Sequence, residues 1–271
     1  MVSRLRFFNL AISIAFGIIG GAIARSPQRI VHGKDISIGE FPSTVVLQRL
    51  SGKHLCGGTL ISFKHVLTAA HCFTRGSKPV GNFDVAPASG IKIIPGHDQL
   101  TDSNNLKYYL ASHIDIHPQW QGEIDDRNSE ADLAVVTLQT EISENEFQKI
   151  SPLPSTIFEP DTLATAVGWG LTDEKESGLP SKNLQGISLK VLDTNFCKAH
   201  RDPFLPNNVI CAEGSNRKAS ICTGDSGGPL YNTKKEVIGV ISYSYECTGD
   251  FASVFTDVFA YKQWIEHIKN H

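Results

Sequence analysis

The chain has 271 residues, of which 41% are hydrophobic and 20% are charged, a composition typical of globular proteins and not of disordered or fibrous ones. Its length allows one large domain or two small ones and excludes a long array of domains. The 25 basic and 28 acidic residues give a net charge of −3, and no cluster of Lys or Arg offers a surface for phosphates. We therefore expect no nucleic-acid partner.

The N-terminus has the pattern of a secretory signal peptide. Arg4 and Arg6 precede an uncharged stretch, residues 7–24, which closes with a small-x-small sequence typical of cleavage sites. This predicts a signal peptide over residues 1–24, cut after Ala24. The alternative is a membrane anchor, which the glycines and polar residues of the stretch disfavour. Because no later segment is long and apolar enough to span a bilayer, we expect a secreted, extracellular protein without a membrane partner in its mature form.

Secretion makes the cysteines candidates for disulfides, because exported thiols meet an oxidising compartment. The arithmetic of six cysteines leaves their pairing open. Metal ligation is less favoured, since no Cys-x-x-Cys pair is present. The cysteines are Cys56, Cys72, Cys197, Cys211, Cys222 and Cys247.

In chain order, short apolar or alternating runs predict β-strands, with Gly, Pro and Asn/Asp clusters between them. The runs cover residues 44–50, 60–67, 91–95, 131–138, 163–169, 185–191, 237–244 and 254–258. Between Glu141 and Pro160 the pattern lapses and three prolines exclude a central strand, which predicts a linker. Two β units follow, over about residues 30–145 and 160–258, and many short strands per unit favour closed barrels or sandwiches.

The C-terminal tail alone repeats with a helical period, which predicts a helix over about residues 258–269. The fold class is therefore all-β with a C-terminal helix. The apolar residues that share the helix face are Val258, Tyr261, Trp264, Ile265 and Ile268.

Ser226 is a candidate nucleophile because it lies between glycines in the segment 222–229. Gly224 permits an unusual backbone turn, and neighbours without side chains let a substrate carbonyl approach the hydroxyl and nearby N–H groups. A glycine-rich hairpin would be the favoured interpretation if the motif stood alone. A serine hydroxyl is a weak nucleophile, so this hypothesis requires a histidine elsewhere in the chain.

His71 and Asp132 are the candidates that would complete such a site. His71 lies among small residues and beside Cys72, and an imidazole can take the serine proton and return it to a leaving amine. Asp132 opens an apolar run, so its carboxylate would be buried and would need a hydrogen-bonded partner. A surface or capping histidine and a strand-end aspartate are the alternative interpretations of these two residues.

Taken together, these motifs resemble those of the chymotrypsin-fold serine proteases of the trypsin-like family, in the same chain order of His, Asp and Ser. The matching segments are 30–33 (Ile-Val-His-Gly), 67–72, 132–138, 168–170 (Gly-Trp-Gly), 224–229, and Ser242 with 254–256.

The resemblance implies two antiparallel six-stranded β-barrels with a catalytic cleft between them, in a monomeric endopeptidase acting on proteins or peptides. Ser226 would attack the substrate, His71 would act as base and then acid, and Asp132 would orient the imidazole. The N–H groups of Gly224 and Ser226 would form the oxyanion hole. No cofactor or metal is implied, and the sequence at His97 departs from that of relatives that bind calcium.

The resemblance also implies a zymogen. Residues 25–29 would be a propeptide, which an activating trypsin-like protease removes by cutting after Arg29. The new ammonium of Ile30 would pair with Asp225, and partners could include protein inhibitors of proteases. The disulfides implied are Cys56 with Cys72, Cys197 with Cys211 and Cys222 with Cys247.

Alignment on the family places Ser220 at the base of the specificity pocket, with Ser242, Ser244 and Ser253 in its walls. A base without charge predicts cleavage after medium-sized apolar residues such as Leu, Met or Ala, with Phe and Tyr next. Cleavage after Arg or Lys, as in a processing protease, would require an acid such as Asp250 to turn inward. A catalytically inactive homologue that serves as a binding module is the rival class, although no triad residue or oxyanion glycine is missing.

Overall fold

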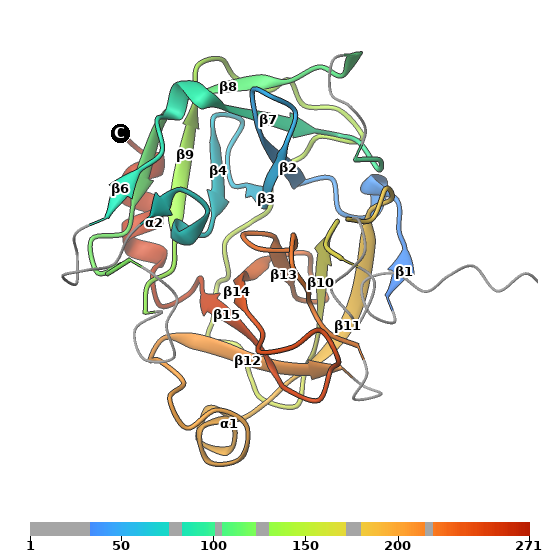
Figure 1. Ribbon diagram of the computed structural model, residues 1–271, viewed down its shortest axis with the longest axis vertical. Helices are drawn as coiled ribbons and strands as arrows, with labels where there is room; N and C mark the ends of the chain where they lie inside the picture. The colour runs from blue at the N-terminus through green and yellow to red at the C-terminus, as the bar shows by residue number, and fades with distance from the viewer. Residues whose placement is uncertain (1–32, 76–82, 101–104, 123–129, 172–179, 215–218) are drawn as a thin grey trace, which may run out of the picture.

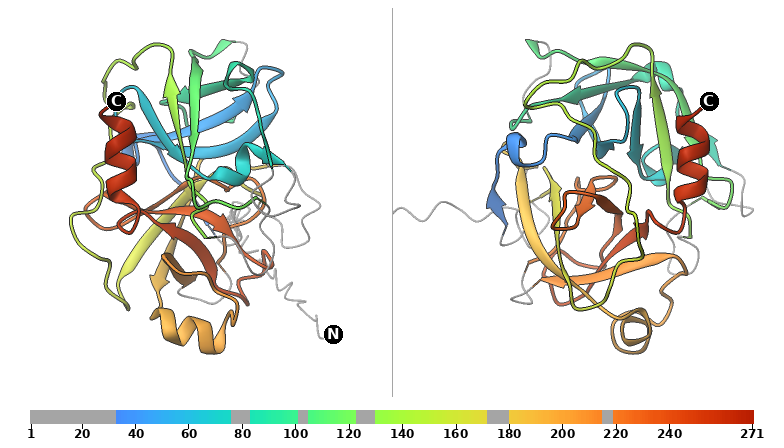
Figure 2. Two further views of the ribbon diagram at one scale, coloured as in Figure 1. Left: turned by 90° about the vertical axis from the view of Figure 1, so that its left-hand side faces the viewer. Right: turned by 180° about the vertical axis from the view of Figure 1, so that it is seen from behind.

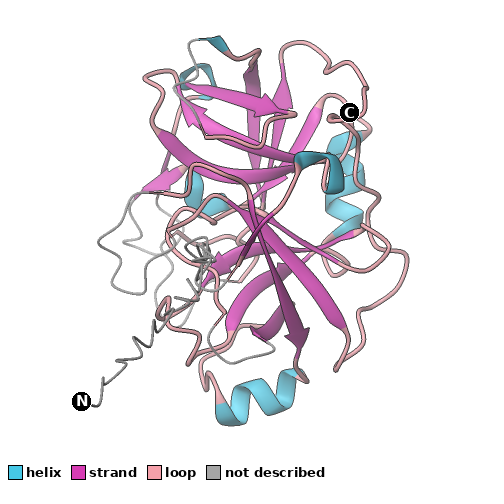
Figure 3. Cartoon of the chain, turned by 90° about the vertical axis from the view of Figure 1, so that its right-hand side faces the viewer, coloured by secondary structure: helices cyan, strands magenta, loops and turns pink. Residues whose placement is uncertain are grey.

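The computed structural model describes residues 33–75, 83–100, 105–122, 130–171, 180–214 and 219–271. The predicted signal peptide and propeptide, and with them Arg29 and Ile30, lie outside these residues. The regular secondary structure of the described residues is mostly β-strand, and helices α1 and α2 lie at the periphery (Figure 3). These helices span Thr194–His200 and Lys262–Lys269.

The first barrel closes six antiparallel strands in the order β2-β3-β4-β9-β8-β7 (Figure 1). A two-stranded sheet of β5 and β6 lies outside this ring. Closure leaves no strand edge in the barrel exposed for pairing with another chain. The bounds are β2 Thr44–Arg49, β3 His54–Leu60, β4 His65–Thr68, β5 Thr74–Arg75, β6 Asp84–Val85, β7 Ile91–Pro95, β8 Tyr109–Ile116 and β9 Ala134–Leu138.

The second barrel is also closed, because β12 pairs with both β15 and β11. Its order is β11-β10-β13-β14-β15-β12, with β1 added at β11. The two six-stranded antiparallel barrels and the C-terminal helix confirm the predicted fold class. The bounds are β1 Lys34–Asp35, β10 Leu163–Gly168, β11 Gln185–Val191, β12 Val209–Gly214, β13 Pro229–Tyr231, β14 Val237–Tyr243 and β15 Ser253–Asp257.

The two ends of the described chain are exchanged between the barrels. β1 is the first strand of the described chain and precedes the first barrel, but it pairs with β11 of the second barrel. Helix α2 follows the second barrel but packs beside the first, as the views from the side and from behind show (Figure 2). There Tyr261 and Trp264 make edge contacts with the His117 ring, at centroid distances of 4.7 and 4.8 Å. The N-terminal strand β1 thus contacts the second barrel and the C-terminal helix α2 contacts the first, so both ends of the described chain help to hold the barrels together.

The linker expected between Glu141 and Pro160 contains no named strand and runs along both barrels. The Ser151 N–H donates to Leu60 O in the first barrel at 2.8 Å, and its hydroxyl donates to Lys235 O beyond β13 at 3.0 Å. These bonds fix the connection at the boundary between the barrels.

Some predicted elements are wrong. The run 60–67 is a hairpin, in which β3 ends at Leu60 and β4 begins at His65. The Ser62 hydroxyl makes the turn by bonding the Lys64 N–H at 3.1 Å and His65 Nδ1 at 2.8 Å, a side-chain turn that competes with a continuous strand.

The sequence also failed to indicate β3 before Leu60, β8, β12, β13 and α1, together with the two-residue strands β1, β5 and β6. A bulge between Ala111 and His113 breaks the alternation of β8. Helix α1 has only seven residues, too few to show a period, and depends on Asp193, whose carboxylate caps the Phe196 N–H at 2.8 Å. The C-terminal helix begins at Lys262 and not at Val258, although Val258 and Tyr261 are buried as expected.

Gly57 of β3 allows the two barrels to approach closely. A Cβ at this position would lie 2.9 Å from the Gly228 Cα, closer than ordinary contacts permit. The Gly57 N–H also donates to Ser226 O at 2.8 Å, which joins the first barrel to the serine turn of the second.

Replacement of Gly57 by Ala is expected to destabilise the protein by about 1–3 kcal/mol, because the added methyl group has no room between two backbones. Urea denaturation measures the loss. Gly90→Ala is the matched control, since no atom lies within 4 Å of a Cβ there. Equal stability of the two variants would contradict this account of the boundary.

Candidate active site

Three side chains singled out from the sequence meet where the barrels pack together. His71 lies in a single turn of 3-10 helix, Ala70–Cys72, directly after β4. Asp132 precedes β9, and Ser226 lies in the turn before β13. His71 and Ser226 line one cavity of about 190 Å³. Asp132 and Ser226 lie 61 and 155 positions after His71 in the sequence, yet all three lie at the boundary between the two barrels.

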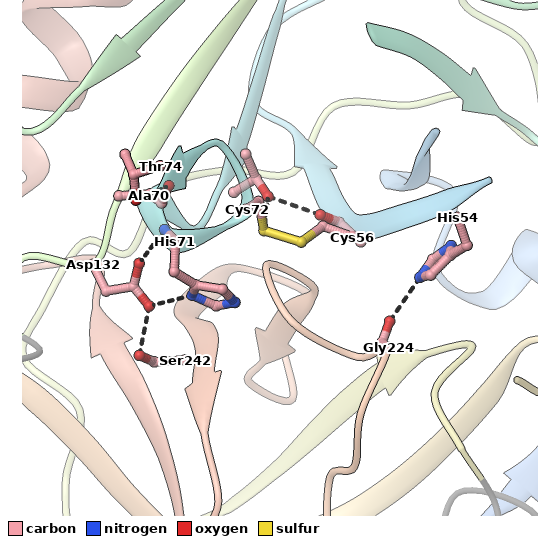
Figure 4. Close-up of a disulfide and its surroundings, with 11 residues drawn as sticks. His54, Cys56, Ala70, His71, Cys72, Thr74, Asp132, Gly224 and Ser242 are labelled. Atoms are coloured by element: carbon pink, nitrogen blue, oxygen red, sulfur yellow. Dashed lines mark hydrogen bonds and ion pairs between the residues drawn. A yellow bond between two sulfur atoms is a disulfide. The ribbon is translucent and has the colours of Figure 1, made fainter. Parts of the chain in front are cut away.

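Local constraints hold His71 and Asp132 in place. The disulfide Cys56–Cys72 ties the turn that carries His71 to β3 (Figure 4). Ala131, just before Asp132, has a φ of 56°, in the left-handed region that L-residues rarely adopt. Such backbone strain persists only where the surrounding structure enforces it, and it is frequent at functional sites.

Asp132 holds the imidazole of His71 in one orientation. Asp132 Oδ2 lies 2.7 Å from His71 Nδ1, and Oδ1 accepts the His71 backbone N–H at 2.9 Å (Figure 4). The Ser242 hydroxyl donates to Oδ2 at 2.6 Å from the second barrel. Because Nδ1–H must face the carboxylate, the neutral ring keeps Nε2 free to accept a proton.

The pKa values of this pair are shifted towards their charged forms. Burial by itself lowers the pKa of His71, but the charge and hydrogen bond of Asp132 outweigh it, so the pKa is raised. Burial likewise raises the pKa of Asp132, but His71 and the hydrogen bonds from His71 and Ser242 reverse this, so the pKa is lowered. The site thus stabilises an imidazolium beside a carboxylate.

The turn before β13 presents N–H groups at Ser226. Gly224 has a φ of 99°, a conformation that glycine adopts without strain. Within the described residues, the N–H groups of Asp225, Gly227 and Gly228 donate to carbonyl groups, whereas those of Gly224 and Ser226 have no acceptor. Two unused backbone donors beside a serine can stabilise an oxyanion.

Asp225, the residue before the serine, is completely buried. Its carboxylate accepts N–H groups from Gly170 at 2.7 Å and Cys222 at 2.9 Å. Burial raises its pKa to about 6, although these two hydrogen bonds act in the opposite direction. No cation contacts this carboxylate within the described part of the chain. The site therefore contains a buried acid whose charge lacks compensation from those residues.

The four predicted pocket serines divide into two pairs. Ser242 and Ser244 line the cavity beside His71, whereas Ser220 and Ser253 are fully buried and do not line it. The hydroxyl groups of Ser220 and Ser244 lie 3.3 Å apart, which closes the space between them. Asp250 is exposed and does not line the cavity.

His54 is a residue of this region that the sequence did not indicate. Its Nε2 lies 2.8 Å from Gly224 O, and since a carbonyl oxygen can only accept, Nε2 carries a proton and donates it (Figure 4). Burial lowers the pKa of His54 despite this hydrogen bond, in agreement with a neutral ring. As one of ten histidines with no distinctive spacing, it carried no signal. It fixes the peptide that follows Gly224.

The cysteines form the disulfides Cys56–Cys72, Cys197–Cys211 and Cys222–Cys247, the pairing that the resemblance implied. Within the described ranges, His71 with Cys56 and Cys72 is the one group of three potential metal ligands close together. Both sulfurs belong to a disulfide, so they are not available as thiolates. Neither α1 nor α2 is long enough to cross a membrane, and the described segments contain no other candidate helix for a span.

Two closed barrels with a histidine, an aspartate and a serine at their boundary define the class of two-barrel serine proteases. The chain matches the model of the Trypsin family over residues 30–265. It therefore belongs to the trypsin family of serine proteases.

Individual relatives agree with this assignment. A trypsin of Saccharopolyspora erythraea is 32% identical over 218 residues, which cover 80% of this chain and 88% of that protein. Chymotrypsin-like elastase family member 1 of Felis catus is 30% identical over 280 residues, covering 97% of this chain and 98% of the relative.

Solved structures show the same fold. Human heparin binding protein superposes with a TM-score of 0.72 at 25% identity, over 89% of this chain and 97% of that one. Neuropsin from mouse brain superposes with a TM-score of 0.74 at 23% identity, over 88% and 98%, a likeness that shows the fold alone.

Proposed function

We propose that the protein is a secreted serine endopeptidase that cleaves peptide bonds through an acyl-enzyme, with Ser226 as nucleophile, His71 as base and acid, and Asp132 as the orienting carboxylate. The observation that carries this proposal is the 2.7 Å contact between His71 Nδ1 and the buried Asp132 Oδ2, with His71 lining the same cavity as Ser226. The three disulfides support secretion, since such bonds persist in oxidising compartments.

In this mechanism the Ser226 oxygen attacks the substrate carbonyl carbon while its proton passes to His71 Nε2. The carbonyl electron pair moves onto oxygen, where the N–H groups of Gly224 and Ser226 stabilise it, each by about 3 kcal/mol. Asp132 stabilises the imidazolium, which then protonates the leaving amine. Water attacks the resulting ester in the same way, releasing the acid and restoring the Ser226 hydroxyl.

We further propose that the protein is made as a zymogen activated by a trypsin-like protease that cuts between Arg29 and Ile30. The supporting observation is Asp225, a buried acid with two N–H donors and no cation within the described residues. A new ammonium at Ile30 would compensate its charge. Since Asp225 lies between the two oxyanion donors, such an ion pair would fix the turn that carries them.

The relatives include both a trypsin and an elastase family member, so the specificity of this chain depends on its own pocket. We propose that the pocket takes small to medium uncharged residues. Ser220 supplies no charge for an arginine, which would lose its hydration without compensation. The hydroxyl groups of Ser220 and Ser244 lie 3.3 Å apart, which leaves no room for a ring between them and disfavours large side chains.

The catalytic proposal predicts that Ser226→Ala abolishes labelling by a fluorophosphonate probe and cleavage of peptides by the activated protein. Asp132→Asn should lower kcat by about 10⁴-fold, the magnitude established for the triad of this family, because the imidazole then adopts the wrong tautomer. Ser188→Ala, on an exposed position of β11, is the control. If the activated wild type is not labelled, the chain is a binding module instead.

The activation proposal predicts that trypsin treatment activates the wild type but not Arg29→Gln.

The activation proposal also predicts how the stability of the uncut chain changes with pH. The uncut chain holds a proton on Asp225 up to about pH 6, whereas the unfolded chain releases it near 3.8, so its stability falls as pH rises between these values. The total loss is about 3 kcal/mol.

In the cut protein the new ammonium of Ile30 would hold the pKa of Asp225 down, so the loss of stability with rising pH should be absent. Urea denaturation of both forms from pH 4 to 7 measures the difference, which should grow with pH. Full activity of uncut Arg29→Gln, or identical pH profiles of the two forms, would refute the scheme.

The pocket proposal predicts that p-nitroanilide peptides ending in Ala or Leu are cleaved faster than those ending in Phe, and much faster than those ending in Arg. Ser244→Gly should raise the Phe to Ala ratio by about tenfold, a typical value for removing a steric restriction in a pocket. Ser112→Gly, at an exposed position of β8, should leave this ratio of Phe to Ala cleavage unchanged. Efficient cleavage after Arg would contradict the uncharged pocket and implicate Asp250.

A further inference from the structure

Tyr243, the last residue of β14, forms a wall of the cavity that contains His71 and Ser226. Its ring makes an edge contact with Tyr245 at a centroid distance of 5.8 Å, and Tyr245 contacts Phe251 at the same distance. Tyr245 and Phe251 are 39% and 38% exposed. An aromatic row therefore leads from the cavity to the surface.

Tyr243 also packs against a buried apolar cluster of the second barrel. The cluster surrounds the disulfide Cys197–Cys211, which joins α1 to β12. Its buried residues are Leu192, Cys197, Leu205, Val209, Cys211, Ala252 and Val254. The ring thus lies between the cavity and the segment that follows α1.

Asp202, in that segment, is only 3% exposed and lies 41 residues from Tyr243 in sequence. Asp202 Oδ2 accepts the Tyr243 hydroxyl at 2.9 Å, and Oδ1 accepts the Phe204 N–H at 2.9 Å. The Asp202 N–H donates to Cys197 O at 2.9 Å. The carboxylate is therefore held in a fixed turn beside a disulfide.

The hydrogen bond specifies the direction of the ring. A tyrosine hydroxyl at a cleft can be satisfied by water, so the ring would otherwise be free to turn towards solvent. A buried carboxylate, in contrast, requires donors, and hydrogen bonds to charged groups are stronger than neutral ones. Asp202, which does not line the cavity, thus holds the hydroxyl of a tyrosine that does line it.

We propose that Asp202 is a positioning residue for substrate binding, which holds the Tyr243 ring as a rigid wall for an apolar substrate side chain adjacent to the one in the cavity. The inference rests on the proposed peptidase function. Asp202 acts only through Tyr243, so it should affect the binding of peptides that reach the aromatic row and not the chemistry at Ser226.

The test compares Tyr243→Phe, which keeps the ring but removes the hydroxyl, with Asp202→Asn and the double variant, all after activation. Two substrates are used: a tetrapeptide p-nitroanilide with Leu next to the cleaved residue, and an ester of a single acetylated amino acid. For Tyr243→Phe we expect KM for the tetrapeptide to rise about tenfold with kcat unchanged, a factor typical of one lost hydrogen bond to a charged group. The ester kinetics and fluorophosphonate labelling should not change.

The double variant should be no worse than Tyr243→Phe, since the two residues act as a unit. Tyr109→Phe is the matched control, because this tyrosine is buried in β8 of the first barrel and does not line the cavity. It should leave KM unchanged for both substrates. An unchanged KM in Tyr243→Phe, or equal losses for both substrates, would overturn the inference. Absence of labelling and cleavage by the activated wild type would instead refute the proposed peptidase.

Discussion

The site depends on one buried carboxylate, that of Asp132, which lies at the boundary of the barrels and has no exposed surface. A charge removed from water in this way is stable only with close donors on all sides. Those donors come from both barrels: His71 from the first, and the Ser242 hydroxyl from the second. Thr256 of the second barrel also donates to the Asp132 backbone carbonyl at 2.9 Å. The contacts that orient the imidazole therefore also dock the barrels.

No disulfide joins the two barrels, since each of the three lies within one barrel. The barrels are held together by exchanged tails, by the linker and by the buried hydroxyl of Tyr231, which lies near both Ser43 and Thr44 of the first barrel. The burial of Tyr231 raises its pKa to about 12, so the hydroxyl stays protonated and can donate. The geometry at the catalytic boundary is thus set by many non-covalent contacts around it.

Residues with chemical signatures could be predicted from the sequence. Ser226 stood between glycines, His71 beside a cysteine and Asp132 before an apolar run, and each signal is local. The remaining contacts join residues distant in sequence: His54 lies 170 positions from Gly224, and Asp202 lies 41 from Tyr243. Such pairs have no period or motif, because only the closure of the barrels brings them together.

The same limit explains the errors in secondary structure. The prediction of one strand over residues 60–67 was wrong because the chain turns at Ser62. This turn depends on two hydrogen bonds of the Ser62 hydroxyl, and the apolar residues on both sides of it look like one continuous strand. Ser220 as the base of the pocket stays a prediction, because this residue is fully buried and does not line the cavity beside His71. Its access could not be inferred from the sequence, since it depends on the side chain of Ser244, whose hydroxyl lies 3.3 Å from that of Ser220 and donates to Glu246 O at 2.9 Å.

The serine turn is held from both barrels by hydrogen bonds to its carbonyl groups. From the first barrel, His54 donates to Gly224 O and Gly57 donates to Ser226 O, each at 2.8 Å. From the second barrel, the Leu171 N–H donates to Thr223 O at 2.8 Å. These bonds fix the carbonyl groups around Asp225, but none of them compensates its charge. Burial raises the pKa of Asp225 to about 6, so the ionised carboxylate is disfavoured in this turn, and a cation beside it would favour the ionised form between the two oxyanion donors.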